Sequence, residues 1–335
     1  MDVSRRDFLK TGLAGLGGLC AAAWAAKIFA AETSAAAARS ASAAAPALLA
    51  PKPKVFVITE PKLLDRYGNF NQQSPYPGGV LKRLLQEMTG QREVKDAWRV
   101  FFKDTDVIGI KFDPQSAAEL RTAAPLADLL ASSLVEDADF DVKKIMLLDP
   151  PPFIATVNTR KPPRGYVETF VKIKDRQTQF LRAFDQCTAI LNVPFIKDHR
   201  QFGLAAGMAG LALGVISNPG VFAANGGDPG VAELAACGEI RSRHRLTIVN
   251  AVRGIYDGGP RPEEAKMWNQ TSLLAGTDPV AVDTVALDLL DAARYTHGLK
   301  SLKETGRTSA YLKTAAGMGL GQCEMNRIDL RRLNP

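Results

Sequence analysis

The chain has 335 residues, 46% of them hydrophobic, and a formal charge of +7 at pH 7. This length can bury the core of one large domain or two modest ones. The basic residues form no long run and do not alternate with aromatic residues, so a nucleic-acid partner is not indicated; the mild positive charge suits anionic small molecules or simple solubility.

Residues 1–30 are typical of an export signal. Ser4–Lys10 reads SRRDFLK, with adjacent arginines before a Phe-Leu pair, and Thr11–Ala30 is rich in glycine and alanine and mildly hydrophobic. This pattern resembles a twin-arginine (Tat) signal. It predicts a folded protein exported to the periplasm or another extracytoplasmic location, with the twin-arginine translocation machinery as a partner.

The same segment is a poor membrane span, because Lys27 and several glycines interrupt an apolar run of barely sufficient length. Contact with the membrane is therefore expected only through an uncleaved signal. Residues 31–53 are rich in Ala, Ser and Pro and predict a linker. We expect the folded domain to cover residues 54–335.

Cysteine and histidine usage limits the metal chemistry of this chain. Cys187, Cys237 and Cys323 follow the signal and form no C-x-x-C pair. A four-thiolate iron–sulfur cluster within the chain is therefore not expected. The three histidines, His199 among them, have no metal-ligand spacing, which also argues against structural zinc.

From residue 54 onward, short apolar runs alternate with helical patterns. The expected strands are 55–58, 107–112, 144–148, 188–193 and 246–249, and the expected helices are 78–88, 125–138, 176–184 and 229–240. Continuous apolar runs are typical of buried parallel strands. The alternation predicts an α/β fold, with a mostly parallel sheet and helices on both faces.

Two loop signals complete this outline. The Pro-rich stretch 149–165 predicts a long loop, either a lid or an insertion. No G-x-G-x-x-G or Walker-type loop follows any expected strand.

Ionisable residues follow four of the expected strands. Lys111 stands near the end of the second and Asp113 follows it; Asp149 follows the third, Lys197 and His199 the fourth, and Asp257 the fifth. The carboxyl ends of parallel strands share one edge of a sheet, where ligands bind. Each of these residues alone has the simpler interpretation of a turn former or helix cap. Their recurrence favours a site.

The stretch 275–298 predicts a helix with one unusual residue. Asp278 precedes a proline, which is a strong helix-start signal. Asp283 lies on the apolar stripe with Val280 and Leu287. A buried carboxylate needs a cation, a metal or several hydrogen-bond donors. A structural ion pair and a metal-binding role both remain open for Asp283.

Several segments resemble a known family when taken together and in this order. They are VIGIKFD, VPFIKDH, GGDPGVAEL, YDGGP and TDPVAVD, spread over roughly residues 54–300. They are similar to the exported branch of the family named domain of unknown function 362. The resemblance implies an α/β fold, frequent export and, in some members, attached iron–sulfur modules. Family polar positions fall on Lys111, Lys197, His199, Asp257, Asp278 and Asp283.

Two departures from that family pattern are visible. A Lys-Asn pair is expected where Gly210-Leu211 stand, and a histidine is expected near Ala223-Ala224. Their loss removes a cation and an imidazole from the implied site. The chain is then a divergent or a catalytically silent member.

The leading hypothesis is an exported enzyme that acts on a small, anionic molecule. Lys197 and His199 are its expected catalytic residues: the lysine would hold a carboxylate or phosphate, and the histidine would act as a general base or metal ligand.

The remaining assignments concern binding. Lys111 and Asp257 are expected to bind a cofactor, and Asp113, Asp149 and Asp283 to hold a divalent metal such as Mg, Ca, Mn or Fe. The alternatives are a non-catalytic periplasmic binding protein and a scaffold for an envelope system.

Overall fold

The structure is a computed structural model that describes residues 51–72, 74–115, 117–150, 157–259 and 266–334. The segment expected to be a twin-arginine signal, nearly all of the expected linker and part of the Pro-rich loop lie outside these residues. Lys52–Pro335 groups into one structural unit. Within the described ranges, no helix combines the length and the apolar character needed to span a membrane.

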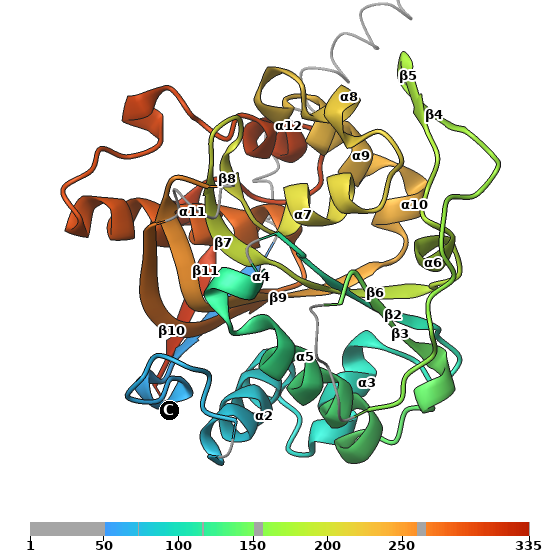
Figure 1. Cartoon of the computed structure of the whole chain (residues 1–335), viewed down its shortest axis with the longest axis vertical. Coiled ribbons are helices and arrows are strands. Elements are labelled where there is room, and N and C mark those ends of the chain that lie inside the picture. Colours follow the sequence, from blue (N-terminus) through green and yellow to red (C-terminus); the bar gives the residue numbers. More distant parts are fainter. Residues whose placement is uncertain (1–50, 73, 116, 151–156, 260–265, 335) are drawn as a thin grey trace, which may run out of the picture. The chain divides into compact units, whose positions relative to one another are not determined.

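The helices and strands alternate along most of the chain (Figure 1). In order they are β1 (Lys54–Thr59), η1 (Pro61–Leu63), α2 (Tyr76–Thr89), α3 (Val94–Phe101), β2 (Ile108–Phe112), α4 (Ala117–Leu120), α5 (Ala123–Ser132), η2 (Ser133–Asp137), η3 (Val142–Lys144), β3 (Ile145–Leu148), β4 (Val171–Ile173), β5 (Arg176–Thr178), α6 (Arg182–Asp185), β6 (Ala189–Val193), β7 (Phe195–His199), β8 (Gly203–Ala205), α7 (Gly207–Gly214), α8 (Pro219–Ala223), η4 (Asn225–Gly227), α9 (Gly230–Ala236), α10 (Gly238–Arg241), β9 (His244–Asp257), β10 (Lys266–Gly276), α11 (Pro279–Thr296), η6 (Lys303–Thr305), α12 (Tyr311–Gly317), η7 (Met325–Arg327) and β11 (Asp329–Leu333).

The central sheet is mixed but mostly parallel. Its order is β11-β1-β10-β9-β6-β2-β3, with β7 paired to β9 and β8 paired to β7. Strands β3, β2, β6 and β9 run parallel to one another, and β7 runs parallel to β9. Strand β10 is antiparallel to both of its neighbours, β1 and β9. The parallel part brings the carboxyl ends of β2, β3 and β6 to one edge.

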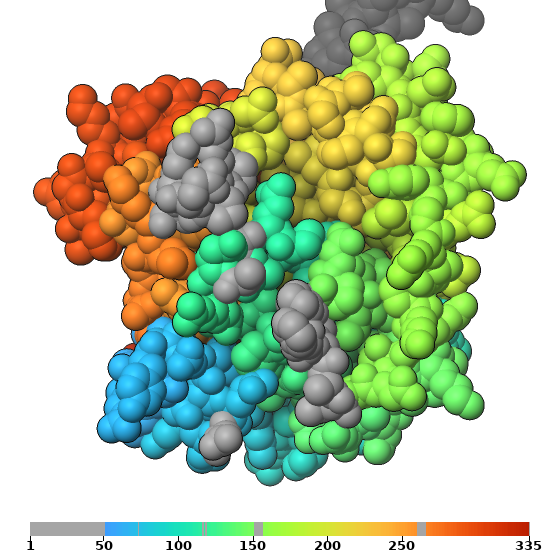
Figure 2. Space-filling model, viewed as in Figure 1, coloured from blue at the N-terminus to red at the C-terminus, as the bar shows by residue number. Residues whose placement is uncertain are grey.

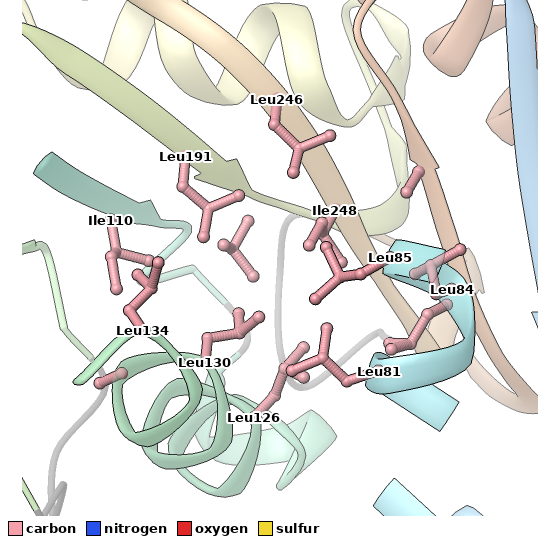
Figure 3. Close-up of a cluster of buried hydrophobic side chains, with 14 of the residues drawn as sticks. Leu81, Leu84, Leu85, Ile110, Leu126, Leu130, Leu134, Leu191, Leu246 and Ile248 are labelled. Carbon is pink, nitrogen blue, oxygen red and sulfur yellow. The ribbon is translucent and has the colours of Figure 1, made fainter. Parts of the chain in front are cut away.

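Helices cover both faces of this sheet, as the α/β prediction requires. Helices α2, α3 and α5 lie against one face, and α7 and α11 lie against the other (Figure 1). On that second side, α9 packs on α7, and α12 packs on α9 and α11. On the first face, leucines of α2 and α5 pack against inward residues of β2, β6 and β9, including Ile110, Leu191 and Ile248 (Figure 3). Because side chains alternate along a strand, Lys111 and Asn192 point to the other face, toward α7.

Most of the expected elements are confirmed. Strands β1, β2, β3 and β6 match four expected strands to within a residue, and α2 and α5 with η2 match two expected helices. The expected helix 229–240 is interrupted: Cys237 has an extended backbone between α9 and α10. The helix expected over 176–184 is wrong, because this stretch forms β5 and the short α6.

The segment 157–185 runs along one side of the face in Figure 2.

Two strands differ from expectation in a way that matters for the site. Strand β9 extends from His244 to Asp257, far beyond the expected 246–249. Lys197 and His199 do not follow a strand but lie within one, β7, which is separated from β6 by Pro194. A proline has no N–H to donate to a ladder, so it marks the break between the two strands.

The three cysteines of the described chain are free thiols. Cys187 is buried, and burial raises its pKa to about 12. A thiol in that state is not ionised at neutral pH and is a poor nucleophile.

Candidate functional site

A pocket of about 380 Å³ lies at the carboxyl ends of β2 and β3 and beside β7. Four of the predicted residues line it: Lys111, Asp113, Asp149 and His199. The opposite wall is built by α7 and α8. These four side chains therefore converge on one pocket, as predicted for polar residues at the strand ends.

Lys111 and Asp149 form an ion pair on the wall of this pocket. The Lys111 Nζ lies 2.9 Å from an Asp149 carboxylate oxygen, and the lysine side chain is only 2% exposed. Nζ also donates a 2.6 Å hydrogen bond to the Phe112 carbonyl. A Cβ on Gly214 of α7 would lie 2.7 Å from this Nζ, so glycine lets the helix approach the ammonium group.

Asp149 has an unusual backbone. It directly follows β3 and has a φ of +50°, in the left-handed region that non-glycine residues seldom adopt. Its side chain is 36% exposed, far more than that of its lysine partner. Such strain is typical of residues placed for function, since the surrounding structure must hold them there.

A second ion pair, between Lys197 and Asp113, lies beside the same pocket. Lys197 Nζ lies 2.7 Å from an Asp113 oxygen, and the lysine is 1% exposed. Nζ also donates to the Gln115 carbonyl at 3.1 Å, and Asp113 accepts a hydrogen bond from the Gln115 backbone N–H. Asp113 lines the pocket while Lys197 does not, so Lys197 acts on the pocket through Asp113.

The hydrogen-bond capacity of the two lysines is not exhausted. An ammonium group has three N–H donors. Each lysine commits one donor to its aspartate and one to a backbone carbonyl. Among the residues that the structure describes, one donor of Lys111 is thus left for a ligand in the pocket that it lines.

His199 is held in one tautomer. Its Nδ1 lies 3.2 Å and 3.3 Å from the backbone nitrogens of Gln201 and Phe202, which donate to it. Its ring stacks on Phe202, with centroids 3.9 Å apart. Burial and the nearby Lys197 lower the pKa of His199 to about 4. At neutral pH the ring is therefore uncharged, and its proton is on Nε2.

Asp283 lies apart from this pocket. It is fully buried, and its two oxygens accept hydrogen bonds of 2.7 Å and 2.9 Å from the backbone N–H groups of Gly207 and Met208. These donors belong to the first turn of α7, so Asp283 connects α11 to the start of the helix that forms the pocket wall. Burial raises the pKa of Asp283 to about 7.

Asp257 also lies elsewhere, in a network of charges beside β7. It contacts Lys266 at 3.0 Å and Arg294 at 3.3 Å. Burial acts to raise its pKa, but hydrogen bonds from these two cations outweigh that effect, and the pKa lies below its usual value. Asp198 is 1% exposed and binds Arg307 in the same network.

Two of the three expected metal ligands, Asp113 and Asp149, line the same pocket, and the third, Asp283, lies apart from it. Asp113 and Asp149 are each paired with a lysine, and Asp283 is bonded to α7. Nowhere in the described ranges do three or more His, Cys, Asp or Glu side chains form a group suited to a metal ion. Because a lysine neutralises each of the two carboxylates at the strand ends, this donor set does not fit a divalent metal.

The two departures from the family pattern both lie at the pocket. Gly210 and Ala223 line its α7 and α8 wall. A Cβ on Gly210 would meet only Pro194, at 3.8 Å, so this part of the wall is open. The two positions where the resemblance implies a lysine and a histidine therefore hold small residues in the pocket wall.

Some site residues were missed at the level of sequence. Gln115 and Gln201 line the pocket, and Gly214 holds the helix close to Lys111. Gln201 follows directly on FIKDHR and could have been found by its position. Gly214 carries no signal in a run of alternating small residues.

Residues 156–288 match the model of a family described as domain of unknown function (DUF362). This span confirms the resemblance in part and includes Lys197, His199, Asp257 and Asp283, whereas Lys111, Asp113 and Asp149 precede it. A search of curated proteins found no match.

Proposed function

We propose that this chain binds a small anionic molecule in the pocket at the strand ends and acts on it by acid–base chemistry. The observation that carries the proposal is the convergence of Lys111, Asp113, Asp149 and His199, from three separate strand ends, on one pocket of about 380 Å³. Concave pockets with a few convergent polar groups are the usual form of small-molecule sites.

The polar groups in the pocket wall indicate which class of ligand the pocket can bind. The uncommitted N–H of Lys111 and the Nε2–H of His199 are donors and suit an anionic or carbonyl oxygen. The carboxylates of Asp113 and Asp149 accept and suit hydroxyl or amino groups. The α7 part of the wall, including Leu213, is apolar. A hydroxylated or aminated carboxylate satisfies all three requirements.

Each residue has a role in this proposal. Asp149 is the more exposed carboxylate and takes up a proton from the ligand. Lys111 and His199 stabilise the negative charge that develops on the ligand oxygen. Lys197 is a positioning residue, because it holds Asp113 and lies behind it.

A binding protein without catalysis is the second candidate. Both ammonium groups are already neutralised by aspartates, and Gly210 and Ala223 leave the opposite wall without functional groups. A pocket of this kind can hold a ligand yet lack the groups that a reaction needs.

The export proposal has a separate basis. Ser4–Lys10 carries the paired arginines of a twin-arginine signal. Replacing both Arg5 and Arg6 by Lys should retain the full chain in the cytoplasm, measured by cell fractionation and immunoblotting. An unchanged distribution between fractions would refute this assignment.

Ligand identity is tested first. Native mass spectrometry of the full chain should reveal a co-purifying small molecule, and calorimetric titration with gluconate, lactate and L-serine should give saturable binding of at least one. Lys111→Met should weaken that binding about tenfold or more, since it removes a charged hydrogen bond. The exposed Lys313→Met serves as the matched control.

Turnover then separates the two candidates. Proton NMR of the full chain with the bound compound should show new product signals that vanish in Asp149→Asn. Binding without any product would favour the binding protein. Equal binding by wild type and Lys111→Met, or none by either, would overturn the assignment of this pocket.

A further inference from the structure

We propose that a second cavity, on the other side of α7, is a separate binding site for a small carboxylate with an apolar body. The cavity has a volume of about 200 Å³ and lies between α7, α10 and the start of α11. Nothing in the proposed function uses it.

Helix α7 separates the two cavities. Its residues Gly207, Met208, Leu211 and Ala212 line the second cavity, whereas Ala209, Gly210, Leu213 and Gly214 line the first. Residues three or four positions apart share a face of a helix, so these two sets lie on opposite faces of α7. This explains why GMAGLALG is apolar all round, as a helix with no water-facing side is expected to be.

The floor of the second cavity is apolar. Met208, Leu211, Ile240 and Leu320 contribute to it, and Ala235 closes one side. An apolar cavity of about 150 Å³ is large enough to hold benzene. A volume of about 200 Å³ therefore suits a ligand with a ring or a short branched chain and a few polar atoms.

Polar groups that line the cavity have unused hydrogen-bonding capacity. Asn192 is 2% exposed and donates through Nδ2 to the Gly207 carbonyl, while its Oδ1 receives no hydrogen bond from the described residues. An amide oxygen accepts hydrogen bonds, so it can receive one from a ligand that brings an O–H or N–H.

The positive charge beside the cavity indicates where the acid group of the ligand binds. Arg241 lines the cavity, is exposed, and its guanidinium has no acceptor among the residues that the structure describes. Thr277 also lines the cavity, and its hydroxyl is likewise unbonded within the described chain. Guanidinium groups bind carboxylates with two parallel hydrogen bonds, so the ligand's acid group belongs at Arg241.

His244 does not supply a second cation. Its Nε2 lies 2.8 Å from the Thr247 hydroxyl, and burial, with the nearby Arg245, lowers its pKa to about 4. The imidazole is therefore neutral at pH 7, and Arg241 supplies the positive charge at this cavity.

The test uses three probes with the full chain. 4-Hydroxybenzoate has the acid, the apolar ring and a donor; benzoate lacks the donor; 4-hydroxybenzyl alcohol lacks the acid. In calorimetric titrations at pH 7, 4-hydroxybenzoate should bind most tightly. Benzoate should bind about fivefold more weakly and the alcohol about tenfold or more.

Variants locate the binding. Arg241→Gln should weaken 4-hydroxybenzoate about tenfold, and Ala235→Leu, which fills the cavity, should abolish binding. Arg327→Gln, an exposed arginine away from the cavity, should not change it. Lys111→Met should also leave it unchanged, which separates this site from the strand-end pocket.

Two results would overturn the proposal. One is the absence of saturable binding of either carboxylate. The other is binding that survives both Arg241→Gln and Ala235→Leu. Because Arg241 is a surface residue without side-chain partners in the described chain, its variant tests the proposal even where Ala235→Leu disturbs folding.

Discussion

The buried carboxylate of Asp283 should make the stability of this protein depend on pH in an uncommon direction. Its pKa is raised from 3.8 to about 7, because the group is fully buried. A raised pKa means that the folded state binds the proton more tightly than the unfolded state. The associated stability is fully present below about pH 4 and is lost as the pH rises to about 7.

The size of the effect follows from the shift. One pKa unit corresponds to 1.36 kcal/mol, so a rise from 3.8 to about 7 amounts to about 4 kcal/mol in the free energy of unfolding. Roughly 2.5 kcal/mol of this should be lost between pH 5 and pH 8. Asp283→Asn has no titrating group and should not show this loss.

The assay is urea denaturation of the full chain at half-unit steps from pH 5 to pH 8, with wild type and Asp283→Asn side by side. The asparagine NH₂ cannot accept the second α7 hydrogen bond, which costs about 1–3 kcal/mol at every pH. The comparison therefore uses the slope with pH. Asp288→Asn, exposed on the same helix, is the matched control and should keep the wild-type slope.

The reasoning is refuted by equal slopes in wild type and Asp283→Asn. Equal slopes would mean that the two backbone donors at α7 compensate the burial and keep the carboxylate ionised.

Three further outcomes are expected from the strand-end pocket and its surroundings. Gly214→Ala should displace the Lys111 ammonium, because the new Cβ would lie 2.7 Å from Nζ, and should weaken hydroxycarboxylate binding about tenfold in calorimetry. In the control Gly210→Ala, the nearest atom to the new Cβ is 3.8 Å away, so this variant should bind the ligand as wild type does. It should also gain about 0.5–1 kcal/mol of stability, because alanine favours a helix more than glycine does. With a pKa of about 4, His199 stays neutral from pH 6 to pH 8, so binding of a lactate-type ligand should vary less than about twofold over that range; a tenfold change would contradict the neutral ring. Asp257→Asn should lower the free energy of unfolding by about 1 kcal/mol at pH 7 and by less at pH 3, because a lowered pKa stabilises the folded state only while the carboxylate is ionised. The variant should bind the ligand as tightly as wild type does. A large loss of affinity would place Asp257 at the site.

Much of the parallel sheet could be predicted from the chain, because its strands are continuous apolar runs. The convergence of Lys111, Asp149 and His199 followed from the same topology, since parallel strands share an edge. Strand β7 was harder to predict. Pro194 ends one strand, and the charged residues after it are unusual for a buried strand until their ion pairs are known.

Other features depend on contacts that a linear pattern does not contain. The burial of Asp283 could be predicted from its place on an apolar stripe, but its partners are backbone N–H groups of α7, and backbone donors have no signature in the sequence. The stretch 176–184 contains apolar residues at helical spacing. Its first part nevertheless pairs with β4, because hairpin contacts decide the conformation of so short a segment.

The position of β1 has a consequence for how the chain folds during synthesis. This strand, at Lys54–Thr59, lies between β10 and β11, and both neighbours come from residues 266–333. The first described strand therefore cannot find its place in the sheet until almost all of the chain has left the ribosome. Such pairing between distant segments makes folding slow. The expected linker 31–53 separates the proposed export signal from β1, so the strand that follows the linker enters the sheet only after β10 and β11 have been made.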